Sequence, residues 1–326
     1  MFARISRGWA LMSESWQVLK FDKQLMLFPI LSAIACLLVM ASFAVPVIVS
    51  PELRNSFIKM AKVEQQQEQE ERREEAEEQA EGFAPHHNRH HQHREGQSFQ
   101  FTAEQIVPAV IGFLFYLATN FVIVFFNTAL VCCALARFNG GSATLGDGLN
   151  AARARLPQIF GWALLSATVG IILKQVEDRA SFIGKFIVGL IGMAWAATTF
   201  MVVPILAAER LGPFAAVKRS ASLLRKTWGE ALVGQVSFGA VQMLFMLPAF
   251  LAIFAAGYVS AVTNTVWPIA IVGVLAGVFI ILLAITFSTL QQIFLAAVYQ
   301  YAADGTVPNG FSPALIESAF KPKDAK

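Results

Sequence analysis

The sequence predicts an all-α integral membrane protein in which about six transmembrane helices form three helical hairpins. Hydrophobic residues make up 56% of the 326 residues and charged residues only 14%, whereas charged residues approach a quarter of a soluble domain. The apolar residues also gather in blocks of about 20 or more, each long enough to cross roughly 30 Å of hydrocarbon. A water-soluble core would not separate its charges in this way.

Six apolar blocks define the expected spans, at residues 25–49, 104–136, 159–176, 184–208, 230–257 and 266–303. We interpret the first as a retained span because 24 residues precede it and its apolar run is too long for a cleaved signal peptide. Four domains are therefore expected. They are an N-terminal helix with the first span at 1–49, an extramembrane Glu/Gln/His-rich loop at 50–103, a five-span membrane domain at 104–303 and a cytoplasmic tail at 304–326.

The distribution of Lys and Arg predicts the side on which each loop lies. Fifteen of them lie before the first span, between spans two and three, between spans four and five, and after the sixth. The other side holds ten, and seven of these are in the long 50–103 loop, where positive charge influences topology less. Because positive segments tend to stay cytoplasmic, we expect a bacterial inner-membrane protein with both termini in the cytoplasm and the 50–103 loop periplasmic or extracellular.

Short amphipathic helices that lie in the membrane interface are expected before the odd-numbered spans. A shift of 68 residues aligns residues 156–164 with 224–232, which indicates a weak internal repeat. The N-terminal segment looks like another copy. One helical face of it carries the apolar residues Ile5, Trp9, Met12, Trp16 and Leu19.

The segment 213–228 is the most strongly basic copy. It begins with a proline at a favourable first-turn position, and one face carries Phe214, Val217, Ala221, Leu224 and Trp228. We expect this helix to lie in the membrane interface with its cations against anionic lipid headgroups. The expected partners are membrane lipids, with other membrane proteins as further candidates, and no nucleic acid. The predicted lipid-interface residues are Lys218, Arg219, Arg225, Lys226 and Trp228.

The 50–103 loop has the most unusual composition in the chain. Residues 64–81 hold nine glutamates opposed only by Arg72 and Arg73, which suits either a solvated single helix or a disordered linker. All five histidines follow within residues 86–93, at spacings that suit weak binding of a divalent transition metal such as zinc, nickel or copper. A low-complexity tract without metal is the alternative, and no other cofactor is expected. The predicted metal ligands are His86, His87, His90, His91 and His93.

Charge is scarce near the centres of the spans, which disfavours a proton- or ion-coupled machine because a fixed ion there costs at least about 2.5 kcal/mol. Uncharged polar residues such as Asn120 and Gln292 more often join helices by hydrogen bonds than line a pathway. Gly273 and Gly277 are expected to permit close helix packing inside the chain. No Walker loop, His-Glu-x-x-His motif, Gly-x-Ser-x-Gly elbow or dinucleotide fingerprint is present, so no enzyme activity is expected.

These features favour a non-catalytic membrane module whose basic helices interact with lipids or proteins. The alternative is a permease, channel or lipid-translocating protein with an uncharged polar pathway between its hairpins. A contiguous polar cavity through the packed spans would favour the alternative.

Three stretches of sequence carry a resemblance to a known family. Residues 15–23 read Ser-Trp-x-x-Leu-Lys-x-Asp-Lys and lead into Leu-Phe-Pro at 27–29, and residues 126–130 and 216–228 fit the same pattern. The chain thereby resembles, over nearly its whole length, an uncharacterised bacterial family of multi-pass membrane proteins, domain-of-unknown-function family 6159. It is more distantly similar to the membrane domains of some glycerophosphodiester phosphodiesterases, without their catalytic domain. The family supplies no catalytic residues, and the Glu/Gln/His-rich loop looks like an addition to its pattern.

Overall fold

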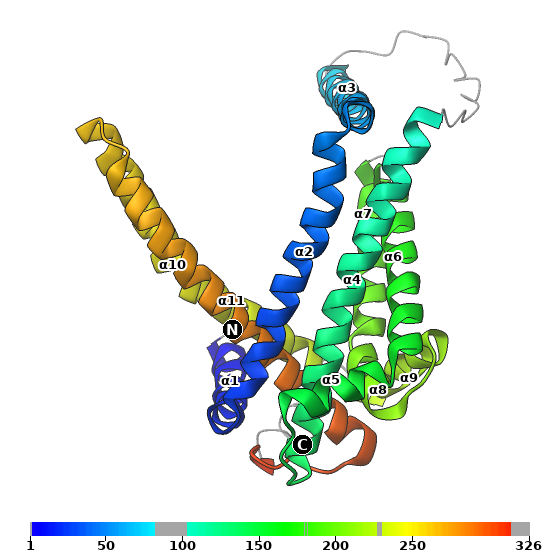
Figure 1. Cartoon of the computed structure of the whole chain (residues 1–326), viewed down its shortest axis with the longest axis vertical. Helices are drawn as coiled ribbons and strands as arrows, with labels where there is room; N and C mark the ends of the chain where they lie inside the picture. The colour runs from blue at the N-terminus through cyan, green and yellow to red at the C-terminus, as the bar shows by residue number, and fades with distance from the viewer. Residues whose placement is uncertain (1, 82–102, 179, 181, 227–229, 314–326) are drawn as a thin grey trace. The chain divides into compact units, whose positions relative to one another are not determined.

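Helices account for the regular structure in the described part of the chain (Figure 1). The computed structural model describes residues 2–81, 103–178, 180, 182–226 and 230–313, and no strand occurs among them, which confirms the all-α prediction. The helices, in chain order, are α1 (Phe2–Phe21), the 3-10 helix η1 (Lys23–Met26), α2 (Leu27–Val49), α3 (Pro51–Glu81), α4 (Ala103–Phe138), α5 (Leu145–Arg153), α6 (Leu156–Asp178), α7 (Phe182–Thr199), α8 (Val202–Glu209), α9 (Pro213–Lys226), α10 (Glu230–Thr263) and α11 (Trp267–Asp304).

Six helical segments of the described residues are long and apolar enough to cross a membrane, in agreement with the six predicted spans. Large apolar side chains remain exposed on several of them, including Phe254 and Ile183, as expected for surfaces that face lipid. The short helices α1, α5 and α9 come before α2, α6 and α10, as the repeat predicted. The six segments are Lys23–Val49, Ile106–Phe138, Leu156–Asp178, Ile183–Glu209, Gly239–Thr263 and Trp267–Asp304.

The chain divides into two compact units, a larger one of Met1–Cys36 with Asn120–Lys326 and a smaller one of Leu37–Thr119. In the smaller unit, Phe43 of α2 packs edge-to-face on Phe115 of α4, with the ring centroids 5.7 Å apart. α3 continues as one helix to Glu81. Of the two alternatives for the glutamate-rich run, the structure therefore has the single helix.

The core of the larger unit lies around the C-terminal half of α11. Most side chains from Phe287 to Gln300 are buried, whereas Val274 and Leu275 in the first half are exposed. α10 lies beside α11 as a hairpin (Figure 1), and α11 also packs with α1, α8 and α9. With 38 residues, α11 is about 57 Å long and exceeds the hydrocarbon thickness of a bilayer. Its second half therefore serves the protein core.

The fourth predicted span, 184–208, is interrupted near its end. A turn at Phe200 and Met201 separates α7 from α8. Pro204 explains the interruption, because proline lacks the amide N–H that would bond to the carbonyl of residue 200 and its ring crowds that carbonyl. The predicted span is confirmed as the candidate span Ile183–Glu209, and the break within it was not predicted, since hydropathy does not register one proline among apolar residues.

α5 has a defined start and a close contact with α4. Thr144 and Asp147 form a capping box, in which the Thr144 Oγ1 accepts from the Asp147 N–H and the Asp147 carboxylate accepts from the Thr144 N–H. Gly148 is buried where α5 meets α4. A Cβ built there would lie 2.6 Å from Cys133 Sγ and 2.7 Å from Phe28 Cζ, so this close approach requires glycine.

Gly273 and Gly277 do not make the close contact that their spacing suggested. A Cβ built at either position meets no described atom within 4 Å. The prediction of internal packing through this pair is therefore wrong. A Gly-x-x-x-Gly spacing permits close approach of a second helix but does not enforce it.

Candidate functional site

The ends of α1, α4 and α11 meet in the larger unit. Phe311, which follows α11, packs edge-to-face on Phe138 at the end of α4, with the ring centroids 5.7 Å apart. The backbone N–H of Ser312 donates a hydrogen bond to the Glu14 carboxylate of α1 over 3.2 Å. The segment after α11 is thereby attached to two other helices.

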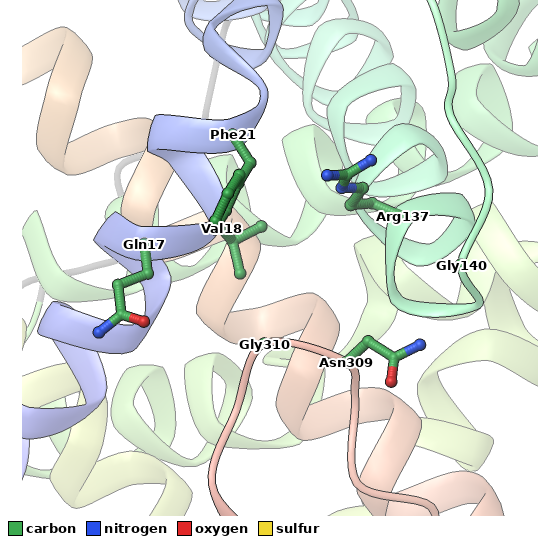
Figure 2. A pocket seen from close by; sticks show the side chains of 7 residues that line it. All are labelled: Gln17, Val18, Phe21, Arg137, Gly140, Asn309 and Gly310. Atoms are coloured by element: carbon green, nitrogen blue, oxygen red, sulfur yellow. The ribbon is translucent and has the colours of Figure 1, made fainter.

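A pocket of about 370 Å³ opens beside these contacts (Figure 2). In the close-up view Arg137 points from the end of α4 toward α1, and Asn309 lies near Gly140. Gly140 and Gly310 have φ angles of 81° and 95°, which glycine adopts without strain. The pocket thus joins a cation and the Asn309 carboxamide to an apolar wall from α1. The lining residues are Gln17, Val18, Phe21, Arg137, Gly140, Asn309 and Gly310.

α9 is held against the larger unit by a face of small and apolar residues. Ala216, Ser220 and Leu223 are fully buried, and their spacing of three and four residues places them on one side of the helix. α9 packs with α6, α7, α8 and α11. This docking face differs from the apolar stripe on which the sequence prediction rested.

Ser220 connects α9 to the break between α7 and α8. Its Oγ accepts a hydrogen bond from the Met201 N–H over 3.1 Å, and both residues are buried. The Met201 amide lies at the start of α8, where the first N–H groups have no partner within their own helix. A buried amide left unpaired costs about 1–3 kcal/mol. The serine therefore stabilises the start of α8 and positions α9.

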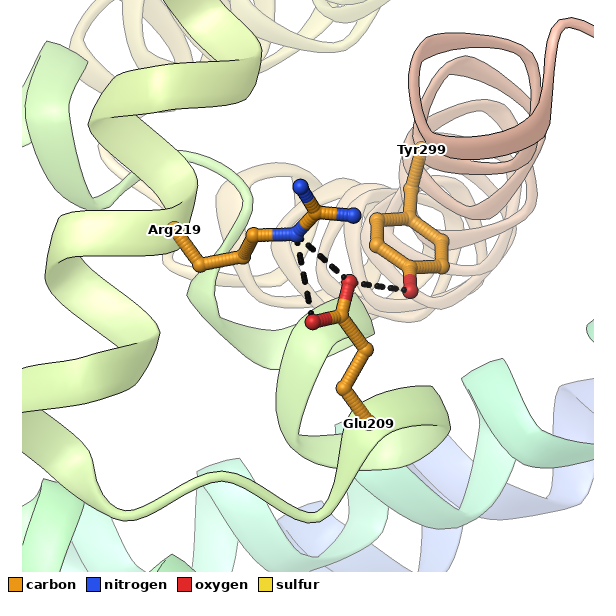
Figure 3. Close-up of polar contacts among 3 residues, drawn as sticks. All are labelled: Glu209, Arg219 and Tyr299. Carbon is orange, nitrogen blue, oxygen red and sulfur yellow. Dashed lines mark hydrogen bonds and ion pairs between the residues drawn. The ribbon is translucent and has the colours of Figure 1, made fainter.

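A polar cluster links α9 to α8 and α11 (Figure 3). Arg219 Nε donates to both carboxylate oxygens of Glu209, over 2.9 and 3.2 Å, and the Tyr299 hydroxyl donates to Glu209 Oε1 over 2.9 Å. The hydrogen bond to Glu209 raises the pKa of Arg219 above its ordinary value, so the guanidinium stays charged. The Arg219 and Glu209 side chains are 34% and 25% exposed. Solvent therefore screens the ion pair, and its main effect is to orient α9.

The other sides of α9 face away from the core. Lys218 and Arg225 are exposed, and Phe214 is 76% exposed. Val217 and Leu224, from the predicted apolar stripe, are half-buried between the docking face and the exposed cations. The helix therefore has three sides, one for the protein core, one apolar flank and one charged flank.

The predicted lipid-interface residues thus have different surroundings. Lys218 and Arg225 lie on the exposed charged flank, whereas Arg219 is engaged by the carboxylate of α8. The Lys226 side chain and Trp228 lie outside the described residues. Contact of this set with lipid stays a prediction.

α1 also divides its predicted apolar face. Met12 and Leu19 are buried, whereas Trp9 and Trp16 of the same face are 51% and 41% exposed. Trp9 stacks on Phe245 of α10 with the ring centroids 6.1 Å apart. α1 therefore packs against the α10–α11 hairpin and leaves tryptophan surface accessible, which suits the boundary between lipid and water.

The predicted metal ligands His86, His87, His90, His91 and His93 lie outside the described residues. Among the residues that were placed, no group of three or more His, Cys, Asp or Glu side chains is arranged to hold a metal ion. Metal binding by the histidine-rich loop stays a prediction.

Sequence reasoning missed Ser220, Glu209 and Tyr299. Glu209 and Tyr299 are 90 residues apart in the chain, and Ser220 sits in a run of small residues without a motif. One signal was available: Glu209 is an isolated carboxylate at the end of an apolar block, and such a group usually has a partner when it is partly buried.

Comparison with curated proteins and with solved structures found no match to this chain. The distant similarity to the membrane domains of glycerophosphodiester phosphodiesterases therefore has no support. A family model matches residues 106–310 and is described as a family of unknown function, DUF6159. The match begins within α4, so it is shorter than the near-complete resemblance that the sequence suggested. Because it covers more than half of the chain, this multi-pass membrane protein belongs to the family of unknown function DUF6159.

Proposed function

We propose that this protein is a non-catalytic membrane module whose α9 binds anionic lipid headgroups through its charged flank. The observation that carries the proposal is the attachment of α9 by its buried face and by the Arg219–Glu209–Tyr299 cluster, which leaves Lys218 and Arg225 exposed. A helix that is already fixed loses little conformational entropy when a ligand binds. An acidic surface of a protein partner is the alternative ligand for the same flank.

Two exposed cations set the scale of this interaction. A basic residue near an anionic leaflet contributes about 1 kcal/mol, less at high salt, so Lys218 and Arg225 together supply about 2 kcal/mol. Arg219 adds less because the Glu209 carboxylate offsets its charge. An attraction of this size orients a protein that its spans already hold in the membrane.

The proposed setting is the inner membrane of a bacterial cell, with α9 and both termini on the cytoplasmic side. The fifteen Lys and Arg residues in the short segments of that side support this orientation. Residues 50–103 would then face the periplasm or the exterior, where the histidine tract would meet divalent metal ions.

A permease or channel, the alternative function, needs a continuous polar path through the packed spans. Several described polar groups make contacts of another kind, although Thr128 Oγ1 and Gln292 Oε1 are buried without a hydrogen-bond partner. Asn120 of α4 donates to the Ser166 hydroxyl of α6 over 2.8 Å, and the hydroxyls of Thr198 and Thr286 donate to carbonyls of their own helices. Bonds of this kind join helices or satisfy a hydroxyl within one helix. They support the module over the permease.

Lipids that copurify with the full chain test the proposal. The double variant Lys218→Gln with Arg225→Gln removes the charged flank, and Arg54→Gln with Lys174→Gln removes the same charge from exposed positions elsewhere. Mass spectrometry of the purified proteins should show a ratio of phosphatidylglycerol to phosphatidylethanolamine lowered about threefold or more in the α9 variant alone.

Two other outcomes bear on the proposal. Equal lipid ratios in both variants and the wild-type protein would refute lipid binding by α9. A crosslinked protein partner lost in the α9 variant alone would assign the charged flank to protein recognition instead.

A further inference from the structure

The pocket between α1, the end of α4 and the segment after α11 carries an inference that is independent of the α9 proposal. Among its lining residues Arg137 carries the charge, and its guanidinium makes no ion pair with any residue that the structure describes. Asn309 adds a carboxamide, and Val18 and Phe21 add apolar surface on the side of α1 that faces Arg137, whereas the Gln17 carboxamide points away from Arg137 (Figure 2). This lining favours an anion with an apolar portion.

Contacts around the pocket hold its walls in place. Gly310 lies so close to α1 that a Cβ there would be 3.0 Å from Val18 Cγ2. The next residue, Phe311, packs on Phe138 of α4, and the Ser312 N–H donates to a carboxylate of α1. The loop is therefore fixed to both helices, and a site with preformed walls loses little conformational entropy on binding.

The pocket also lies where two candidate spans end. The candidate span Ile106–Phe138 ends one residue after Arg137, and the span that ends at Asp304 precedes Asn309 by five residues. Both spans are longer than the roughly 30 Å hydrocarbon layer, so their ends reach the headgroup layer or beyond it. The helix dipole favours an arginine in the last turn of α4, but it does not account for the concave surface with carboxamides and apolar side chains around it.

We propose that this pocket binds the phosphate of an anionic phospholipid, with Arg137 as the principal ligand. A guanidinium presents paired N–H groups that match two phosphate oxygens in one plane, and the Asn309 amide supplies a further donor. A volume of about 370 Å³ is at the small end of ligand pockets and suits a headgroup, while the acyl chains stay in the hydrocarbon layer. A soluble phosphate ester shares the phosphate chemistry and lacks the chains.

Native mass spectrometry of the full chain in detergent tests the proposal with dioleoylphosphatidylglycerol, dioleoylphosphatidylcholine and inorganic phosphate as probes. Arg137→Gln removes the charge, and Asn309→Asp places a carboxylate at an exposed loop position of the pocket. Arg153→Gln is the matched control, because Arg153 is exposed on α5 and does not line the pocket. The Kd for phosphatidylglycerol should rise about tenfold or more in both pocket variants and change less than about twofold in the control.

Inorganic phosphate distinguishes the two sources of the phosphate group. For a lipid site, inorganic phosphate in millimolar excess should change the Kd for phosphatidylglycerol by less than about twofold. Phosphatidylcholine should bind more weakly than phosphatidylglycerol. Displacement of phosphatidylglycerol by inorganic phosphate that depends on Arg137 would overturn the lipid assignment in favour of a soluble phosphate ester.

Equal phosphatidylglycerol binding by the wild-type protein, Arg137→Gln and Asn309→Asp would overturn the site itself. In the background Lys218→Gln with Arg225→Gln, which removes the charged flank of α9, Arg137→Gln should still raise the Kd for phosphatidylglycerol about tenfold. Failure of the pocket proposal is therefore distinguishable from failure of the α9 proposal.

Discussion

Replacement of Gly148 by alanine should destabilise the contact between α5 and α4. The added Cβ would lie 2.6 Å from Cys133 Sγ, 2.7 Å from Phe28 Cζ and 3.0 Å from the Ala129 carbonyl oxygen. Phe28 is buried and the Ala129 oxygen belongs to the backbone, so neither atom moves without disturbing α2 or α4. Overpacking of this kind costs about 1–3 kcal/mol.

Helix propensity acts in the opposite direction, since alanine is about 1 kcal/mol more favourable than glycine inside a helix. The net loss is therefore between about 0 and 2 kcal/mol, and three contacts at or below 3.0 Å place it in the upper half of that range. Gly146→Ala is the matched control on the same helix, because its Cβ would meet only Thr144 Oγ1, at 3.7 Å. The control should be neutral or stabilising by up to about 1 kcal/mol.

Thermal unfolding in detergent, followed by tryptophan fluorescence, measures both variants. At about 2–4 °C per kcal/mol, Gly148→Ala should unfold a few degrees below the wild-type protein and Gly146→Ala at or above it. Adding Cys133→Ala to Gly148→Ala removes one clashing atom and should recover part of the loss. Equal unfolding temperatures for the two alanine variants would refute the reasoning, because α5 would then not lie against α4 as described.

Four further predictions test other parts of the structure. Ser220→Ala should cost about 1–3 kcal/mol because it leaves the buried amide at the start of α8 unpaired, whereas exposed Ser222→Ala should stay within about 0.5 kcal/mol; equal unfolding temperatures would contradict the bond. Hydrogen bonds at the N-cap of α5 lower the pKa of Asp147 below 3.8, so the carboxylate stabilises the fold above that pH and this contribution disappears as the pH falls through the lowered pKa. The wild-type protein should thus lose its stability advantage over Asp147→Asn progressively as the pH falls below 3.8 and through the lowered pKa, and parallel pH profiles would count against the capping box. Reporter fusions should place both termini and α9 in the cytoplasm, and strong periplasmic activity of a fusion after Lys226 would reverse that topology. Calorimetry on a peptide of residues 82–97 should show binding of zinc, nickel or copper at micromolar or weaker affinity. The absence of heat at neutral pH would favour the alternative, a low-complexity tract that binds no metal.

The spans were predictable because each apolar block is recognisable without knowledge of its neighbours. The predicted block 266–303 and the observed helix Trp267–Asp304 differ by one residue at each end. The start of α9 was also predictable, since Pro213 is a local signal. The break before α8 was missed because Pro204 lies in an apolar block that hydropathy treats as continuous.

The candidate site was less predictable because packing between distant segments decides it. Glu209 meets Tyr299 across 90 residues of sequence, and no local pattern pairs them. Amphipathicity sorts a helix into apolar and charged sides, so it overlooks a third side of small residues such as Ala216 and Ser220, whose burial depends on the shape of the helices around them.

The three sides of α9 separate what the helix needs to fold from what it presents outward. Ala216, Ser220 and Leu223 are confined by the volume beneath them and by one hydrogen bond. Lys218 and Arg225 meet no such restriction, so reversing their charge should leave the helix in place. Surface substitutions alone can therefore adapt the same fold to membranes or protein partners of different charge, without any compensating change in its core.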